Sequence, residues 1–121
     1  MRVGIDIVEV DRIKLSDKFL EKIAGEEEIA YIRTYKTEHS QKESCAGLWA
    51  VKEAVFKLLG LGRESGVAFK NVVLCHEENA RPYVKLNGLA LETFEALGLK
   101  EIEVSISHTE NYAAAVAVAR G

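Results

Sequence analysis

The longest helical pattern in the sequence covers residues 40–59, and it limits most strongly what the chain can fold into. Ser40 and Glu43 have the spacing of a capping box at its start, and Gly60 and Gly62 predict its end. The apolar residues of this segment recur with the helical period, which should turn one stripe toward a core. The stripe consists of Leu48, Val51, Val55, Leu58 and Leu59.

Shorter segments on both sides of this helix complete a mixed pattern. Strand-like runs rich in β-branched residues cover 3–8, 71–75, 82–86, 102–107 and 112–119. The last four of these runs predict two hairpins. Helical segments are expected at 11–23, 26–35 and 88–97, with Ser16 as an N-cap and Gly25 and Gly98 as breaks. Because about 100–200 residues make one ordinary domain, residues 1–121 should form a single α+β domain.

Charge and hydropathy exclude several classes of protein. The sequence has 16 basic and 19 acidic residues, for a net charge of −3, which argues against a duplex nucleic-acid binder. It begins without the apolar segment of a signal peptide, and no run approaches the ~18 apolar residues that span a membrane. Cys45 and Cys75 have neither zinc-site spacing nor a disulfide framework. We therefore expect a cytoplasmic protein whose two cysteines are reduced core residues.

Asp6 and Glu53 are the first candidate site residues. Asp6 interrupts an apolar strand, where a carboxylate needs an ionic, hydrogen-bonded or metal partner, or caps a neighbouring backbone. Glu53 shares one line of the helix with Trp49 and Lys57, and an exposed Glu53–Lys57 ion pair is the simpler alternative. If strand and helix pack together, the two carboxylates supply the hard oxygen ligands that Mg²⁺ prefers. Lys57 can then neutralise a bound phosphate.

A second polar cluster is formed by Ser107, His108 and Thr109 at the predicted end of a strand. Hydroxyl and imidazole groups in succession can hold a phosphate or the polar part of a nucleotide. A purely structural histidine is the alternative, and spacing alone does not decide between them. The segment Gly60–Gly62 lacks the pattern of a phosphate loop, although it lets a ligand approach the backbone.

Three segments taken together carry a resemblance to a known family. They are GIDIVEVDRI at 4–13, WAVKEAVFKLLG at 49–60 and SISHTENYAAAVAV at 105–118. In order and separation they resemble the holo-acyl-carrier-protein synthases, the short bacterial type of the 4′-phosphopantetheinyl transferase family. The similarity runs along nearly the whole chain and includes RPYVKLNG at 81–88. It implies that family's fold, with a long central helix packed on a mainly antiparallel sheet.

The resemblance implies a Mg²⁺-dependent reaction in support of fatty acid biosynthesis. The 4′-phosphopantetheine group passes from coenzyme A to a serine of apo-acyl carrier protein, and adenosine 3′,5′-bisphosphate is released. The family's metal-binding and catalytic carboxylates fall on Asp6 and Glu53, and Lys57 is a third catalytic residue that contacts the pyrophosphate. Other contacts to coenzyme A fall on Gly60, Pro82, His108 and Thr109. Either Glu53 or a metal-bound water takes the proton of the serine.

The resemblance also implies protein partners. The family docks the acidic carrier through a basic first helix, for which this chain offers Arg12, Lys14, Lys18 and Lys22. Interspersed acidic residues dilute this patch, and an ordinary solvated face is the alternative. The family further implies a homotrimer with active sites between subunits. The run AAAVAVA at 113–119 suits burial in such an assembly, or equally a central strand of the chain's own core.

The chain departs from the family pattern next to the predicted helix. Leu48 stands where many relatives carry an arginine, and the basic cluster that often precedes the helix is thin. His39 and Lys42 remain as candidate contacts to the 3′-phosphate of the nucleotide. Two other functions also fit the same residues. One is a non-catalytic trimeric scaffold in which the two carboxylates and Lys57 form a buried ion-pair network, and the other is a nucleotide pyrophosphohydrolase that uses water as its nucleophile.

Overall fold

The computed structural model describes the backbone of residues 1–121 and every side chain except that of Arg63. Five strands and four α-helices alternate with short 3-10 turns in the described chain. In order they are β1 (Arg2–Glu9), η1 (Val10–Arg12), α1 (Asp17–Ile23), α2 (Glu26–Arg33), α3 (Glu38–Leu59), η2 (Arg63–Ser65), η3 (Phe69–Asn71), β2 (Val72–His76), β3 (Pro82–Leu86), α4 (Gly88–Ala96), β4 (Glu101–His108) and β5 (Tyr112–Arg120).

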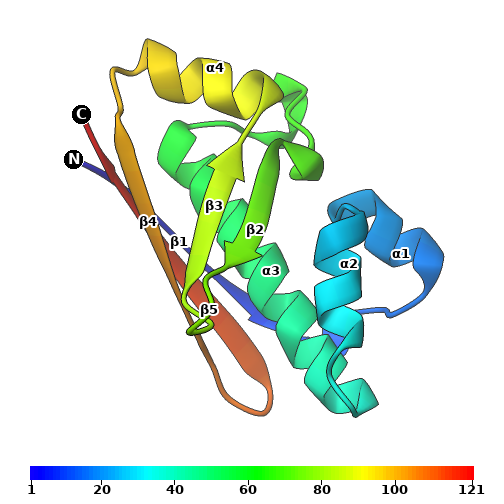
Figure 1. Cartoon of the computed structure of the whole chain (residues 1–121). Helices are drawn as coiled ribbons and strands as arrows, with labels where there is room; N and C mark the ends of the chain where they lie inside the picture. The colour runs from blue at the N-terminus through cyan, green and yellow to red at the C-terminus, as the bar shows by residue number, and fades with distance from the viewer.

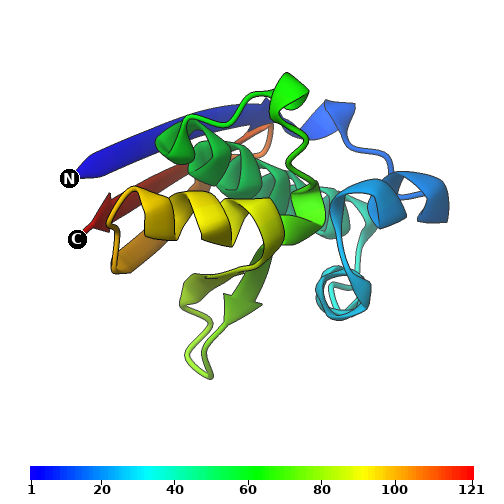
Figure 2. The same cartoon turned by 90° about the horizontal axis from the view of Figure 1, so that it is seen from above.

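Helix α3 lies at the centre, and all other layers pack around it (Figure 1). The sheet of β1, β5 and β4 covers one side of α3, while α1 and α2 lie beside its N-terminal half. The β2–β3 hairpin and α4 pack against α3 next to β4, and the view from above shows the two chain termini side by side (Figure 2). The predicted α+β architecture with a long central helix and antiparallel sheets is confirmed.

The three-stranded sheet has the order β1-β5-β4, with both pairs antiparallel. Every second residue of β5 turns toward α3, and the side chains there are the buried alanines Ala113, Ala115, Ala117 and Ala119. Such small side chains let a helix approach a sheet closely. The approach is closest at Gly4 of β1, where a Cβ would overlap the carbonyl oxygen of Ala54. The C-terminal run is therefore a central strand of the chain's own sheet.

Helix α3 begins earlier than the sequence pattern predicts. Its N-cap is Thr37, whose Oγ1 accepts the backbone N–H of Ser40 at 3.0 Å. The predicted capping box of Ser40 and Glu43 is wrong, because an earlier hydroxyl three residues upstream caps the helix instead. The predicted end is correct, since Gly60 follows the helix with a φ of 73°. Glycine adopts this left-handed conformation without a steric penalty.

The shorter elements follow their local sequence signals. The side chain of Ser16 accepts the N–H of Phe19 at 3.3 Å and caps α1, as predicted. Gly25 is the N-cap of α2, and Gly98 follows α4 with a φ of 74°. Both predicted hairpins form, one from β2 and β3 and the other from β4 and β5.

A buried ion pair ties four of these elements together, namely α2, α3, η3 and β2. Lys52 of α3 is fully buried and donates from Nζ to Glu28 Oε1 of α2 and to the Phe69 carbonyl oxygen, both at 3.0 Å. The Glu28 carboxylate also accepts the backbone N–H groups of Gly25 at 2.9 Å and Leu74 at 2.8 Å. Burial lowers the pKa of Lys52, and the neighbouring Glu28 opposes that shift. The pair thus fixes α2 and β2 against α3.

The two cysteines differ in their surroundings. Cys45 lies fully in the core and burial raises its pKa to about 12, whereas Cys75 is only half-buried, so the prediction of two core cysteines is half correct. Both thiols are unpaired. Among the helices that the structure describes, none combines the length and the apolar character required to cross a lipid bilayer.

Candidate functional site

The strand carboxylate of Asp6 points toward α3 and is held by a lysine. Lys57 Nζ donates to Asp6 Oδ1 at 2.9 Å and to the Ile5 carbonyl oxygen at 3.1 Å. The Asp6 side chain is 16% exposed and that of Lys57 is 55% exposed. Lys57 therefore pairs with the strand rather than with Glu53, and the simple Glu53–Lys57 ion pair is replaced. The same exposure argues against the fully buried network of the scaffold alternative.

The close packing of β1 on α3 explains why Asp6 reaches this place. The Nε of Arg2 donates to the Leu58 carbonyl oxygen at 2.8 Å, and Gly4 lies against Ala54. The strand and the helix therefore run in opposite directions. Side chains of a strand alternate between faces, so Asp6 points to the same side as Gly4, one step further along the helix. The long side chain of Lys57 reaches back along α3 to meet Asp6 there.

Glu53 lies on the same line of α3 and has its own hydrogen-bond donor. It is half-buried, and its Oε1 accepts the indole N–H of Trp49 at 3.3 Å. Residues four apart on a helix are neighbours on its surface, so Glu53 is one turn away from Lys57, which holds Asp6. The structure thus joins Lys57 to Asp6 and leaves Glu53 one helical turn from Lys57, although β1 and α3 are far apart along the chain. A site shared by Asp6 and Glu53 stays a prediction.

The donor atoms of this region suit a hard divalent cation. Each carboxylate has one oxygen outside the contacts to Lys57 and Trp49. Among the described side chains no three acidic, histidine or cysteine residues cluster around one point. Two carboxylates alone are what Mg²⁺ accepts, because it usually keeps several waters and substrate phosphate oxygens in its octahedron. The residues fit the cation that the sequence predicts, and that prediction stays open.

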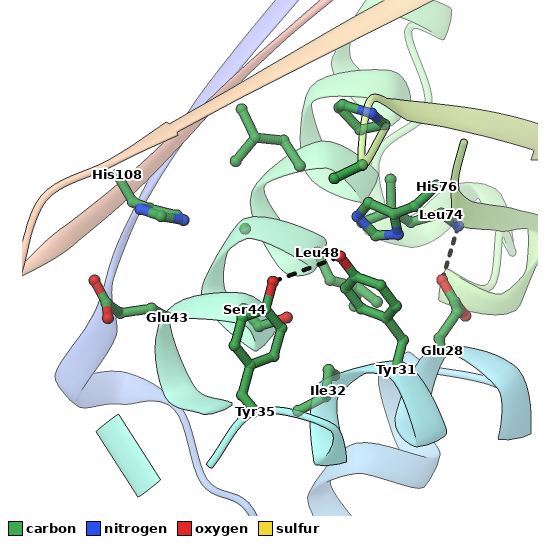
Figure 3. Close-up of a pocket in the computed structure, with 14 residues that line it drawn as sticks. Glu28, Tyr31, Ile32, Tyr35, Glu43, Ser44, Leu48, Leu74, His76 and His108 are labelled. Atoms are coloured by element: carbon green, nitrogen blue, oxygen red, sulfur yellow. Dashed lines mark hydrogen bonds between the residues drawn. The ribbon is translucent and has the colours of Figure 1, made fainter. Parts of the chain in front are cut away.

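A pocket of about 190 Å³ opens on the other side of α3. Its lining side chains come from α2, α3, the β2–β3 hairpin and β4, and they include both aromatic and acidic groups (Figure 3). His108 and Glu43 stand on one side of the pocket, and Tyr31 and His76 stand on the other. Gly47 leaves room for the Ile106 side chain in the pocket lining, since a Cβ there would lie 3.2 Å from it.

Stacked rings form the wall of this pocket. Tyr31 lies parallel to His76 with ring centroids 3.9 Å apart, and its hydroxyl is 3.5 Å from that of Tyr35. The hydrogen bond to Tyr35, together with burial, raises the pKa of Tyr31 to about 12. Burial lowers the pKa of His76, which favours the neutral ring at pH 7. Flat, uncharged ring faces of this kind are suited to a planar heterocycle.

The predicted coenzyme A contacts fall into two separate groups. Lys57 and Gly60 lie on the β1 side of α3, where Gly60 is next to Arg2. His108 and Pro82 line the pocket on the β4 side. In the sheet, β5 lies between the edge strands β1 and β4. These two strands are therefore about 10 Å apart, at ~4.8 Å per strand. Within one chain, the two groups therefore do not form a single pocket.

The remaining predicted contacts have local roles in the structure. Thr109 closes the β4–β5 hairpin, because its Oγ1 accepts the N–H of Tyr112 at 3.2 Å. Nothing in the structure brings its hydroxyl into the pocket. His39 is 3.8 Å from Glu43, and Lys42 is 3.7 Å from Glu38. Leu48, at the position of the missing arginine, is buried and lines the pocket.

Sequence reasoning missed the aromatic wall of the pocket. Tyr31 and Tyr35 have helical spacing, which predicts only a helix, and His76 directly follows the predicted strand at 71–75. Their meeting depends on the hairpin folding back against α2. The i,i+4 spacing of two tyrosines is the only signal that the sequence offers for this wall.

The predicted basic docking residues lie at the surface next to the carboxylate region. Lys18 and Lys22 are exposed on α1, Lys14 is exposed just before it, and Arg12 belongs to η1 rather than to that helix. Asp17, one of the acidic residues that dilute the patch, is paired with Arg33 at 2.6 Å. Arg12 lies 5.9 Å from the ring centroid of Trp49, so the patch reaches the neighbourhood of Glu53.

Both the sequence and the fold are similar to known proteins. Residues 2–117 match the family model ACPS, the 4′-phosphopantetheinyl transferase superfamily. A holo-[acyl-carrier-protein] synthase of Thermoanaerobacter sp. (strain X514) is 39% identical, over 98% of this chain and 86% of its own. One from Clostridium acetobutylicum (strain ATCC 824) is 40% identical, over 96% and 94%.

Solved structures agree with this result. The holo-[acyl-carrier-protein] synthase of Helicobacter pylori in complex with coenzyme A superposes with a TM-score of 0.81 at 28% identity, covering 98% of this chain and 99% of its own. The Bacillus anthracis enzyme in complex with CoA (3′,5′-ADP) gives 0.80 at 30% identity, covering 98% and 94%. The similarity thus extends over the whole fold described above.

Proposed function

Because the chain belongs to the 4′-phosphopantetheinyl transferase superfamily, we propose that it is a holo-acyl-carrier-protein synthase. It transfers 4′-phosphopantetheine from coenzyme A to a serine of apo-acyl carrier protein and releases adenosine 3′,5′-bisphosphate. The observation that carries this proposal is the meeting of Asp6, Lys57 and the turn of Glu53 at the β1–α3 contact. Those residues stand in the two segments on which the family resemblance rests.

The proposed chemistry needs little from the protein except charge and position. Phosphoryl transfer is accelerated mainly by holding the reacting groups and stabilising charge. Asp6 and Glu53 would hold Mg²⁺ through their free oxygens, and the cation when bound would neutralise the diphosphate of coenzyme A. Lys57 is half-exposed and lies 2.9 Å from Asp6, so its ammonium can turn to a phosphate oxygen. Because the lysine side chain is long and flexible, Lys57 can move from Asp6 to the phosphate without a change in the backbone.

The ring-lined pocket is the proposed place for the nucleotide end of coenzyme A. Tyr31 and His76 offer flat, uncharged faces for an adenine, while His108 stands at the opposite side for a phosphate. None of the described side chains that line the pocket is a lysine or an arginine. His39 and Lys42 lie outside the pocket lining, His39 near Glu43 and Lys42 near Glu38, and their contact to the 3′-phosphate stays a prediction.

The separation of the two groups supports an active site built between copies of the chain. The face of the sheet turned away from α3 carries Val3, Ile5 and Ile7, each about two-thirds exposed at 64%, 65% and 66%. Val116 and Val118 of β5 lie beside them on the same face. A contiguous apolar sheet face of this kind is typical of an interface. A homotrimer that covers it can bring the β1 edge of one chain to the pocket of the next.

Subunit complementation tests this arrangement. Asp6→Asn and His108→Ala should each lack activity, yet unfolding and refolding them together should restore it. In a random mixed trimer about a quarter of the interfaces combine an intact β1 edge with an intact pocket. Native mass spectrometry must first show the trimer. Mixed trimers without recovered activity would contradict the shared site.

The exposed lysines of α1 and of the segment just before it form the proposed carrier-docking surface. Lys14, Lys18 and Lys22 present positive charge, and Arg33 neutralises Asp17 among them. Attraction between opposite charges is screened by salt, so the KM for the acidic carrier should rise with ionic strength while the KM for coenzyme A changes less. A KM for the carrier that does not respond to salt would remove this surface from the proposal.

The central experiment is incubation with coenzyme A, Mg²⁺ and apo-acyl carrier protein, followed by intact-mass analysis. We expect the carrier to gain the mass of one 4′-phosphopantetheine group, and Glu53→Gln and Asp6→Asn to abolish the gain. Coenzyme A consumed without a carrier would instead favour the pyrophosphohydrolase. Absence of binding to coenzyme A with Mg²⁺ would favour the scaffold. The two unpaired thiols are typical of a reducing compartment, which supports the proposed cytoplasmic location.

A further inference from the structure

Trp49 makes a contact to Glu53 that has no assigned role in the proposed transfer of phosphopantetheine. Its indole Nε1 donates to Glu53 Oε1 at 3.3 Å, one helical turn further along α3. An indole N–H can only donate, so it selects one carboxylate oxygen and leaves the other for a different partner. A phenylalanine ring at this position would fill similar space without making this bond.

Three elements hold the indole in place. The Trp49 ring lies 5.6 Å from that of Phe19 in α1 and 6.2 Å from that of Phe69 in η3, the second contact being nearly perpendicular at 87°. The Arg12 guanidinium of η1 lies 5.9 Å from the same ring centroid. These separations are within the usual range for aromatic pairs and cation–π contacts. The direction of the N–H is therefore fixed by packing rather than by Glu53 itself.

We infer that Trp49 is a positioning residue for Glu53, which orders the carboxylate for the cation. The inference rests on the function proposed above. A glutamate side chain without a fixed partner samples several rotamers, and ordering it costs binding free energy. The bond from Trp49 removes part of that cost before the cation arrives. Arg12 contacts the Trp49 indole and is also one of the basic docking residues. It therefore connects the docking surface to the Trp49–Glu53 contact.

Trp49→Phe removes the N–H and keeps an aromatic ring between Phe19 and Phe69. We expect the Mg²⁺ concentration for half-maximal activity to rise about three- to tenfold, the scale of ordering one side chain. The KM for the carrier should stay close to that of the unmodified protein. A purely structural role would lower the melting temperature and leave the Mg²⁺ dependence unchanged.

The fluorescence of Trp49 gives a readout that does not depend on turnover. It is the only tryptophan of the chain, so its emission reports directly on the partner of its N–H. Titration with Mg²⁺ in the presence of coenzyme A should produce a saturable change in emission. Adenosine 3′,5′-bisphosphate lacks the diphosphate and should produce a smaller change with the same cation. Glu53→Gln should abolish the Mg²⁺-dependent part.

Phe69→Leu is the matched control, because it loosens the packing of the indole and keeps the N–H. We expect a lower melting temperature together with a smaller rise in the required Mg²⁺ concentration than Trp49→Phe produces, because the N–H is kept. The inference is overturned if Trp49→Phe retains the normal Mg²⁺ dependence while Glu53→Gln is inactive. An active Glu53→Gln with a normal Mg²⁺ response would instead refute the proposed role of Glu53 in holding the cation, and absence of pantetheinylation by the unmodified protein would refute the proposed function itself.

Discussion

Helix α3 carries two lysine–carboxylate pairs with opposite properties. Lys52 and Glu28 are almost completely inaccessible, with side chains 0% and 2% exposed, and backbone groups make further hydrogen bonds to both side chains. Lys57 and Asp6 are separated by a similar distance of 2.9 Å, but the lysine is 55% exposed. The two lysines are five residues apart, so about 140° of helix rotation separates a buried pair from an accessible one.

The difference separates structure from chemistry on a single helix. A buried pair that backbone hydrogen bonds support is costly to break and is closed to a ligand from solvent. A pair with one exposed partner gains little from its own attraction and can exchange that partner for a phosphate or a cation. The first pair holds α2 and β2 in place, while the second is available for reaction. Variants of the two lysines test this contrast.

The largest effect is expected from Lys52→Met. It leaves the Glu28 carboxylate buried without its counter-ion, and breaking such a pair typically costs about 3–5 kcal/mol. The free energy of unfolding measured in urea should fall by this amount. The double variant Lys52→Met/Glu28→Gln carries no lone charge and should recover part of the loss, so it tests the prediction if the single variant fails to fold. Full stability of Lys52→Met would contradict it.

Lys57→Met should reverse that pattern. The pair with Asp6 is partly solvated, so its loss should change the free energy of unfolding by less than about 1 kcal/mol. Removing a cation next to a reacting diphosphate should lower kcat/KM about a hundredfold. Urea unfolding and steady-state kinetics on the same preparation measure both quantities. A strongly destabilised but active variant would show that the Lys57–Asp6 pair serves stability rather than activity, which would contradict the contrast with Lys52–Glu28.

A smaller effect is expected at Cys45, which lies near Lys52 in the core. Burial raises the pKa of its thiol to about 12, so it should react with iodoacetamide only when the protein opens. The half-buried Cys75 should react faster at the same pH. Lys52→Met should raise the labelling rate at Cys45, and Lys57→Met should not. Peptide mass analysis distinguishes the two thiols, and equal rates in the unmodified protein would argue against a closed core.

The sequence predicted the fold well because its signals are local. Helical periodicity at 40–59, strand composition at 3–8 and glycine breaks at Gly25, Gly60 and Gly98 each act over a few residues. The start of α3 was wrong because Thr37 and Ser40 both have cap chemistry, and only the folded backbone selects between them. Propensity alone does not distinguish two adjacent caps.

The candidate site was predicted in part, according to how far its residues depend on tertiary contacts. Asp6 was singled out because a carboxylate in an apolar strand needs a partner, and the structure supplies Lys57. The stacking of Tyr31 on His76 had no such signal, since each residue is ordinary in its own element. The same is true of the Lys52–Glu28 pair, which no spacing indicates because it joins separate helices.

The most direct test of the account is an anomalous diffraction experiment on crystals grown with Mn²⁺ and coenzyme A. The account predicts one metal peak bonded to a carboxylate oxygen of Asp6 and one of Glu53, at about 2.1 Å, with diphosphate oxygens completing its shell. Lys57 should then contact the diphosphate. A metal bound away from either carboxylate, or a diphosphate held with no cation between it and Asp6, would contradict the account.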